Sequence, residues 1–142
     1  MEETDRIASD TLENLFKKNA ILVESDFLQN ILYNDILDSN GFEVFSAKSA
    51  MEGLQKIKEN EYDLAVINVD IGEELFVEKL LNKIRSERSV LPIVGLSIYE
   101  QEKKKNIAKV VNKFLTKPFS IDTFINSVVV CVENGCANSC SG

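Results

Sequence analysis

DLAVINVDIG, residues 63–72, contains an apolar run that ends at Asn68. Asp70 and Gly72 follow within the same stretch. Continuous apolar runs of this length are typical of strands that are buried on both faces of a parallel sheet. In a chain of alternating strands and helices, the carboxyl end of such a strand is a usual place for functional groups, and a nucleophilic carboxylate would be expected there. The functional question is therefore what an amide does at this position.

Short apolar runs alternate with amphipathic segments from Ala20 onward, and this alternation predicts βα units around a parallel sheet. The five predicted strands are residues 20–23, 43–47, 63–68, 92–97 and 113–116. The first, third and fourth are nearly continuous apolar runs, so we place them in the middle of the sheet. The expected fold class is α/β.

Helix signals occur between consecutive strands. The first helix has one apolar face, made by Leu28, Ile31, Leu32 and Ile36. It ends at Gly41, because glycine accepts the left-handed backbone of a helix terminus. The second begins with a capping box, Ser49 to Glu52. The third has a stripe toward the sheet, made by Phe76, Leu80 and Ile84. A fourth, polar helix over residues 100–112 should be the least tightly packed.

We divide the chain into an N-terminal extension (residues 1–19), one domain (20–135) and a flexible C-terminal tail (136–142). The extension has the pattern of a short helix with an apolar side, made by Leu12, Leu15 and Phe16. Docking on the domain, dimerisation and disorder all stay open for it, because so short a helix is marginal without packing.

Composition excludes several classes of function. The 142 residues, 44% of them hydrophobic, suffice for one well-buried domain, and the net charge of −7 offers no long-range attraction to nucleic acid or anionic membranes. No apolar run approaches the roughly 18 residues of a membrane helix, and the acidic N-terminus is unlike a secretory signal. We expect a cytoplasmic domain that binds neither nucleic acid nor membrane by itself.

Metal and nucleotide chemistry find little support. The three cysteines, Cys131, Cys136 and Cys140, form no CxxC pair, and the chain has no histidine. Zinc sites use cysteine and histidine pairs, and disulfide frameworks use an even number of cysteines, so we expect plain thiols. Glycine-rich phosphate loops and the serine elbow of hydrolases are absent as well.

Polar residues follow four of the predicted strands at their carboxyl ends, where open α/β sheets collect functional groups. They are Glu24, Ser25 and Asp26 after the first strand, Asn68 after the third, Ser97 after the fourth, and Lys117 and Pro118 after the fifth. We expect these residues to converge on one pocket, although they come from four separate loops.

Four stretches, in this order, resemble the receiver domain of bacterial two-component response regulators: ILVESD (21–26), YDLAVIN (62–68), LPIVGLS (91–97) and FLTKPF (114–119). The resemblance covers roughly residues 20–133. It implies a flavodoxin-like, doubly wound sheet of five parallel strands in the order 2-1-3-4-5. In such receivers two acids and an aspartate hold Mg²⁺, and that aspartate accepts a phosphoryl group. A serine or threonine and a lysine then bind the phosphoryl oxygens, and an aromatic residue follows the change.

Carried over by position, the resemblance places Asn68 at the phosphoacceptor and Glu24 and Ser25 at the acidic pair. It keeps Ser97 and Lys117 as phosphoryl ligands, Phe114 as the switch residue and Lys117–Pro118 as a candidate cis bond. An acyl phosphate needs a carboxylate nucleophile, whereas an amide has only a neutral oxygen and an NH₂ group. Mg²⁺ prefers anionic oxygens, so we expect weak or absent Mg²⁺ binding and no other cofactor.

The resulting hypothesis is an atypical, non-enzymatic receiver that signals by protein contact without phosphorylation. Glu24 facing Lys117, with Asn68 bonded to either, would satisfy the empty pocket. The expected partner is a signalling protein, bound through the face of the fourth helix, fifth strand and last helix (residues 100–112, 113–116 and 121–134). A homodimer stays open.

Alternatives remain for several residues. Phosphotransfer to a displaced acceptor would use Asp70, Asp26 or Ser97, although we expect the Asp70 carboxylate to point to solvent. Ser25 is a candidate cap of the first helix, and Ser97 a candidate turn residue. Lys103, Lys104 and Lys105 read as a solvated face or a docking patch. The domain is also compatible with the regulatory part of a longer transcription factor or kinase.

Overall fold

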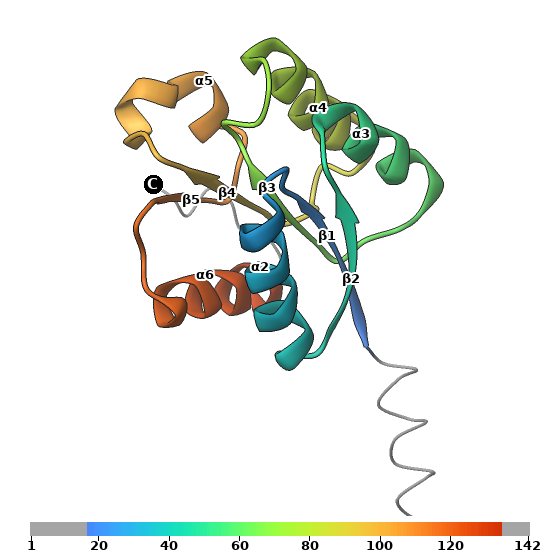
Figure 1. Ribbon diagram of the computed structural model, residues 1–142. Helices are drawn as coiled ribbons and strands as arrows, with labels where there is room; N and C mark the ends of the chain where they lie inside the picture. Colours follow the sequence, from blue (N-terminus) through green and yellow to red (C-terminus); the bar gives the residue numbers. More distant parts are fainter. Residues whose placement is uncertain (1–16, 135–142) are drawn as a thin grey trace, which may run out of the picture.

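The computed structural model describes residues 17–134, which form one sheet covered by helices (Figure 1). The strand order is β2-β1-β3-β4-β5, and all neighbouring strands are parallel. The strands are β1 (Lys18–Val23), β2 (Phe42–Ala47), β3 (Leu64–Asn68), β4 (Ile93–Ser97) and β5 (Lys113–Thr116). The predicted flavodoxin-like fold is confirmed, and every predicted strand ends at the residue where the observed strand ends.

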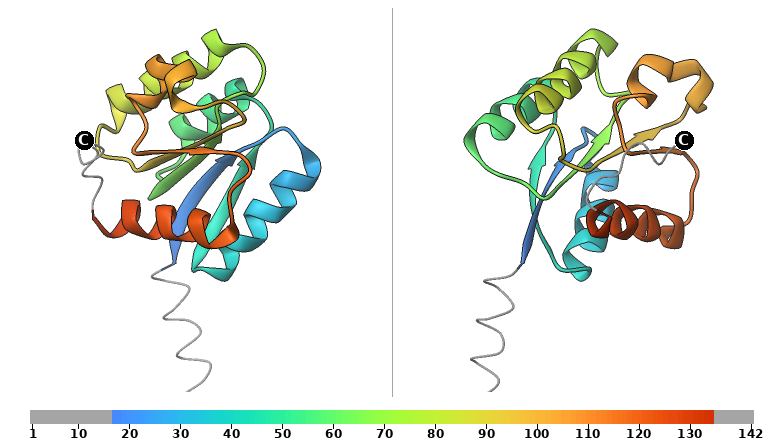
Figure 2. Two further views of the ribbon diagram at one scale, coloured as in Figure 1. Left: turned by 90° about the vertical axis from the view of Figure 1, so that its left-hand side faces the viewer. Right: turned by 180° about the vertical axis from the view of Figure 1, so that it is seen from behind.

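The helices form a layer on each side of the sheet (Figure 2). They are α2 (Phe27–Ser39), α3 (Ala50–Glu59), α4 (Glu74–Glu87), the 3₁₀ helix η1 (Gln101–Lys104), α5 (Lys105–Ala108) and α6 (Ile121–Glu133). Helices α2 and α6 cover one face, and α3, α4 and α5 cover the other. This is the doubly wound arrangement that brings the carboxyl ends of the strands to one open edge.

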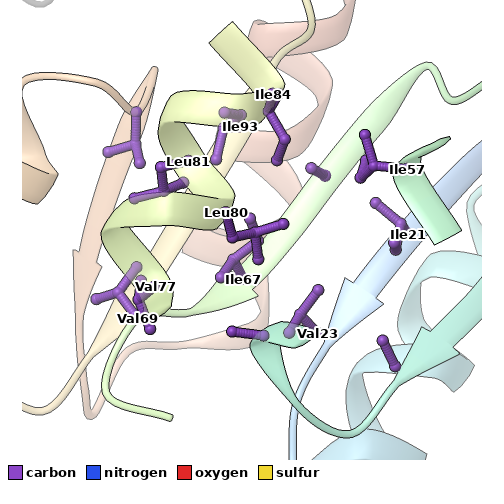
Figure 3. Close-up of a cluster of buried hydrophobic side chains, with 14 of the residues drawn as sticks. Ile21, Val23, Ile57, Ile67, Val69, Val77, Leu80, Leu81, Ile84 and Ile93 are labelled. Carbon is purple, nitrogen blue, oxygen red and sulfur yellow. The ribbon is translucent and has the colours of Figure 1, made fainter. Parts of the chain in front are cut away.

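Each face of the sheet has its own apolar core, because successive side chains of a strand point to opposite faces. Toward α3 and α4 lie buried side chains that include Ile21, Val23, Ile67 and Ile93 (Figure 3). Toward α2 and α6 lie others that include Ala20, Leu22, Val66 and Val94. The central strands are therefore buried on both faces, as their continuous apolar runs predicted.

Helix α3 packs closely against β1 at Gly53. A Cβ atom at this glycine would lie 3.0 Å from Cγ2 of Val23 and 3.4 Å from Cδ2 of Leu80. The helix begins after Ser49, whose hydroxyl accepts a hydrogen bond from the Glu52 N–H at 3.1 Å. The predicted cap is thus confirmed, and the absent side chain of Gly53 lets the helix approach the strand.

The predicted apolar face of α2 is wrong for three of its four residues, and only Ile36 packs partly buried against the core. Leu28 is 73% exposed, and Ile31 and Leu32 also face outward, whereas Tyr33 and Leu37 are buried. The inward face is set by aromatic packing across to α6, because the Tyr33 ring lies 5.2 Å from the ring of Phe124. Apolar residues occur on both faces of α2, so their spacing alone did not identify the buried one.

The buried face of helix α4 differs from the predicted one at its first residue, because Val77 is buried in place of Phe76. Its buried residues are Val77, Leu80, Leu81 and Ile84, and Phe76 is 39% exposed. Leu80 and Ile84 are therefore confirmed as core residues, whereas Phe76 is not.

The predicted helix over residues 100–112 is broken into η1 and α5 and ends early. The Asn112 N–H donates to the Ile93 carbonyl at 2.8 Å, so the chain has already joined the edge of β4 there. Arg85 of α4 also binds the Val110 carbonyl through Nε at 3.0 Å. A helix that continued through residue 112 would need the Asn112 N–H and the Val110 carbonyl for its own hydrogen bonds, and both groups are bonded elsewhere.

Several predictions concern residues outside the described part of the chain: the helix with Leu12, Leu15 and Phe16, and the state of Cys136 and Cys140. Cys131 lies buried in α6. Within residues 17–134, no helix is long and apolar enough to cross a membrane.

Candidate functional site

The carboxyl ends of β1, β3, β4 and β5 lie along one edge of the sheet and place two connected polar clusters there. We call the first the Glu24 cluster; it contains Glu24, Asn68, Lys117 and Gln29. The second is the Asp70 cluster, which contains Asp70, Ser97, Ile98, Tyr99 and Lys104. Residues from four separate loops therefore meet at this edge as expected, but in two connected clusters, and Ser25 lies outside both.

Glu24 is a buried carboxylate, with 1% of its surface exposed. Its Oε2 accepts a hydrogen bond from the Asp26 N–H at 3.0 Å, and its Oε1 lies 3.8 Å from the Lys117 ammonium. Burial of a charge is costly unless it is paired and hydrogen-bonded, and here both requirements are met.

Asn68 connects the two clusters through its amide. Its Nδ2 lies 3.2 Å and 3.0 Å from the two carboxylate oxygens of Glu24, and its Oδ1 accepts from the Asp70 N–H at 2.9 Å. The orientation of the amide follows from its neighbours, because a carboxylate can only accept and an N–H can only donate. An aspartate here would have no hydrogen to offer Glu24.

Lys117 reaches across the edge of the sheet from the end of β5. Its ammonium donates to Oε1 of Gln29 and pairs with Glu24, and its backbone N–H donates to the Ser97 carbonyl at 2.7 Å. The Lys117–Pro118 peptide bond is cis. With its side chain only 17% exposed, Lys117 is a member of the cluster and not a solvated surface lysine.

Gln29 was missed by the sequence reasoning. It lies three residues after Asp26 on α2, and its Nε2 donates to the Asp26 carboxylate at 3.1 Å. That spacing puts two side chains on the same side of a helix, so it was the available signal.

Ser25 lies outside both clusters. It is exposed, and the cap of α2 is Asp26, whose carboxylate accepts from the Leu28 N–H at 3.2 Å. The capping role considered for Ser25 is therefore wrong. Ser25 stands where ordinary receivers have their second acid, and its side chain is exposed to solvent.

Asp70 does not point to solvent, and that expectation is corrected. Its Oδ1 accepts from the Ser97 hydroxyl at 2.9 Å, and its Oδ2 lies 3.2 Å from the same hydroxyl and accepts from the Ile98 N–H at 2.8 Å. The side chain is 17% exposed, and Ser97 is fully buried. Hydrogen-bond donors at the end of β4 hold the carboxylate inward, which its position in the loop did not reveal.

Lys104 provides the positive charge of the Asp70 cluster. Its ammonium lies 3.8 Å from Oδ1 of Asp70, 3.0 Å from Oε1 of Glu74 and 5.0 Å from the centre of the Tyr99 ring. Within the lysine run 103–105 the sequence did not distinguish it from its neighbours.

The acids at this edge also affect Tyr33, which lies in the core under α2 and α6. Burial raises the pKa of the Tyr33 hydroxyl above its ordinary value of 10.0, and the negative charges of Glu24 and Asp26 raise it further. On the opposite face Phe114 is partly buried against the α3/α4 core. Within residues 17–134, no three side chains of the cysteine, histidine and acidic types gather closely enough to hold a metal ion.

Comparisons with known proteins agree with this architecture. A model of the response regulator receiver domain family matches residues 20–129. The sensor protein EvgS of Escherichia coli is 31% identical over 109 residues, which are 75% of this chain and 9% of EvgS. The polar-differentiation response regulator DivK of Brucella abortus is 24% identical over 115 residues, 78% of this chain and 93% of DivK.

Solved structures show the same fold. A CheY-like receiver domain protein from Methanospirillum hungatei superposes with a TM-score of 0.76 at 20% identity, covering 89% of this chain and 99% of that one. TrrA of Thermotoga maritima, solved in complex with Mg²⁺-BeF, superposes with a TM-score of 0.72 at 19% identity, covering 80% and 98%. The family model matches most of the length of this chain, residues 20–129, so the chain belongs to the response regulator receiver domain family of two-component signalling.

Proposed function

We propose that this receiver works without phosphorylation and signals by contact with other proteins. One observation carries the proposal: the acceptor position holds Asn68, whose amide is bonded on one side to Glu24 and on the other to the Asp70 N–H. An amide cannot attack a phosphoryl donor to form an acyl phosphate. Its bonds also leave the site internally satisfied without any ligand.

The same residues fit Mg²⁺ poorly. Mg²⁺ needs several hard, preferably anionic oxygens in octahedral geometry. At the acceptor edge Glu24 is the buried carboxylate, and it is already bound by the Lys117 ammonium and the Asn68 amide. Asp70 faces the Ser97 hydroxyl instead. We therefore propose that the domain uses neither Mg²⁺ nor another cofactor.

A displaced acceptor is disfavoured by the contacts of each candidate. Both oxygens of Asp70 already accept hydrogen bonds, with the Lys104 ammonium nearby. The Ser97 hydroxyl donates to that carboxylate, and Asp26 caps α2. None of these groups is a free nucleophile beside a metal-binding set of acids, which phosphoryl transfer in this family requires.

The proposed partner is a signalling protein that contacts the face of η1, α5, β5 and α6. This face carries exposed lysines of the 103–109 segment, and Val130 of α6 is 41% exposed. The part aligned with this chain is 9% of EvgS and 93% of DivK, so both a stand-alone receiver and a part of a longer protein agree with the proposal. We place the domain in the cytoplasm as part of the same proposal.

A titration with Mg²⁺ and beryllofluoride, followed by amide NMR shifts, tests the proposal. The wild-type protein should show no Mg²⁺-dependent shifts around Asn68. The double variant Asn68→Asp, Ser25→Asp restores the acidic set at the same edge and serves as the positive control, with shifts expected at residues 24, 68 and 97. Saturable Mg²⁺-dependent shifts at Asn68 in the wild type would overturn the proposal.

A further inference from the structure

The carboxylate of Asp70 sits in a ring of donors that is built to hold an oxyanion. The Ser97 hydroxyl lies 2.9 Å from one of its oxygens, and the Ile98 N–H lies 2.8 Å from the other. The Lys104 ammonium supplies a positive charge 3.8 Å away. Hydrogen bonds to a charged acceptor are roughly twice as strong as neutral ones, so these donors favour an anion over a neutral group.

Of these donors, the Ser97 hydroxyl cannot easily be satisfied in another way, whereas the Lys104 ammonium also pairs with Glu74 at 3.0 Å. Ser97 is fully buried, and its hydroxyl oxygen also accepts from the Tyr99 N–H at 3.0 Å, so its hydrogen has to be directed elsewhere. A buried donor without an acceptor is costly. The donor ring therefore selects for a bound anion, and the chain itself provides one.

We propose that Asp70 is a permanent internal ligand of this donor ring, and that it holds the segment from Ser97 to Lys104 in one conformation without any external oxyanion. The inference rests on the proposed function, because an internal ligand replaces the external phosphoryl group that such a receiver does not acquire. It adds the means by which the conformation is maintained.

The tether has a structural consequence for the surface. Tyr99 is positioned by its N–H bond to the Ser97 hydroxyl and by the Lys104 ammonium over its ring at 5.0 Å. Its carbonyl accepts from the Thr116 hydroxyl at 3.0 Å. Asp70 thus acts through Ser97 and Lys104 on an exposed loop beside β5, and it is a positioning residue.

The test compares Asp70→Ala with the wild type by amide hydrogen exchange and by titration with inorganic phosphate. In the variant, the Ile98 amide should lose at least about tenfold of its protection, because it loses a charge-assisted hydrogen bond. Millimolar phosphate should restore that protection and shift the Ile98 and Tyr99 amides in the variant, while the wild type does not respond because Asp70 occupies the donors.

Asp63→Ala is the matched control, since the Asp63 carboxylate also accepts from a backbone N–H, that of Asn19 at 2.8 Å, but outside the donor ring. It should leave the Ile98 amide and its response to phosphate unchanged. Unchanged Ile98 exchange in Asp70→Ala would overturn the inference. Lost protection without a phosphate response would overturn it too, because the donors would then not form an oxyanion site.

These outcomes are separable from the proposed function. If the wild type binds Mg²⁺ at Asn68, the proposed function fails, while the exchange of Ile98 in the Asp70 variant still reports on the internal ligand. If only the Ile98 result fails, the receiver remains independent of phosphorylation and its conformation has another cause.

Discussion

The side-chain amide of Asn68 donates toward both carboxylate oxygens of Glu24, with Nδ2 3.2 Å and 3.0 Å away. This contact joins the ends of β3 and β1 at the edge where ordinary receivers concentrate negative charge. A hydrogen bond thus stands where two carboxylates would repel each other, so we expect the site to be stable without a ligand.

Asn68→Asp should destabilise the domain by roughly 2 kcal/mol at neutral pH, because it replaces a buried hydrogen-bond donor with a second carboxylate facing Glu24. Urea unfolding with and without Mg²⁺ measures this. Mg²⁺ should recover part of the stability of the variant and leave the wild type unchanged. Asn82→Asp, at an exposed position of α4, controls for the added charge, and an equal loss in both variants would contradict the prediction.

Lys117→Met should cost about 3 kcal/mol, because it leaves the buried Glu24 carboxylate without its cation. In the double variant with Glu24→Gln the charge is gone as well, so the loss should be clearly smaller than the sum of the single losses. A double-mutant cycle by urea unfolding measures the coupling. Additive losses would show that the 3.8 Å pair does not stabilise the fold.

Gly53→Ala should destabilise the protein by about 1–2 kcal/mol through overpacking, although alanine is otherwise the better helix former. The new methyl group would meet Val23 at 3.0 Å. Adding Val23→Ala should relieve the clash, so the two substitutions should be less than additive in thermal unfolding. Lys58→Ala, exposed on the same helix, is the control, and a stabilised Gly53→Ala would contradict the packing.

Alkaline pH should destabilise the domain through Tyr33 and Tyr62. Burial raises the pKa of both hydroxyls above 10.0. A group with a raised folded-state pKa contributes stability that is complete below its unfolded pKa and is lost as the pH rises through the folded pKa. Urea midpoints should therefore fall as the pH rises above about 10, and less so in Tyr33→Phe. An equal fall in that variant would contradict the contribution of Tyr33.

Much of the fold could be predicted from the sequence because its signals are local. Buried parallel strands are continuous apolar runs, and all five observed strands end at the predicted residues, for example Asn68 and Ser97. The buried face of α2 could not be predicted, because Leu28 and Leu37 are equally apolar and the choice depends on the distant ring of Phe124. The break after Ala108 likewise depends on Arg85 of another helix.

The candidate site could likewise be predicted only in part from the sequence. Glu24, Asn68, Ser97 and Lys117 could be placed at one edge, because parallel strands end together. The direction of the Asp70 side chain could not, because a residue two positions beyond a strand can turn outward or inward, and only the donors at Ser97 and Ile98 decide. The role of Lys104 could not be predicted either, because only its contact with Asp70 distinguishes it from Lys103 and Lys105.

Intact-mass measurement after incubation with acetyl phosphate and Mg²⁺ tests the central claim most directly. The wild-type chain should keep its unmodified mass, while the Asn68→Asp, Ser25→Asp variant should gain one phosphoryl group under the same conditions. A stoichiometric phosphoryl adduct on the wild type would contradict the claim that this receiver works without phosphorylation.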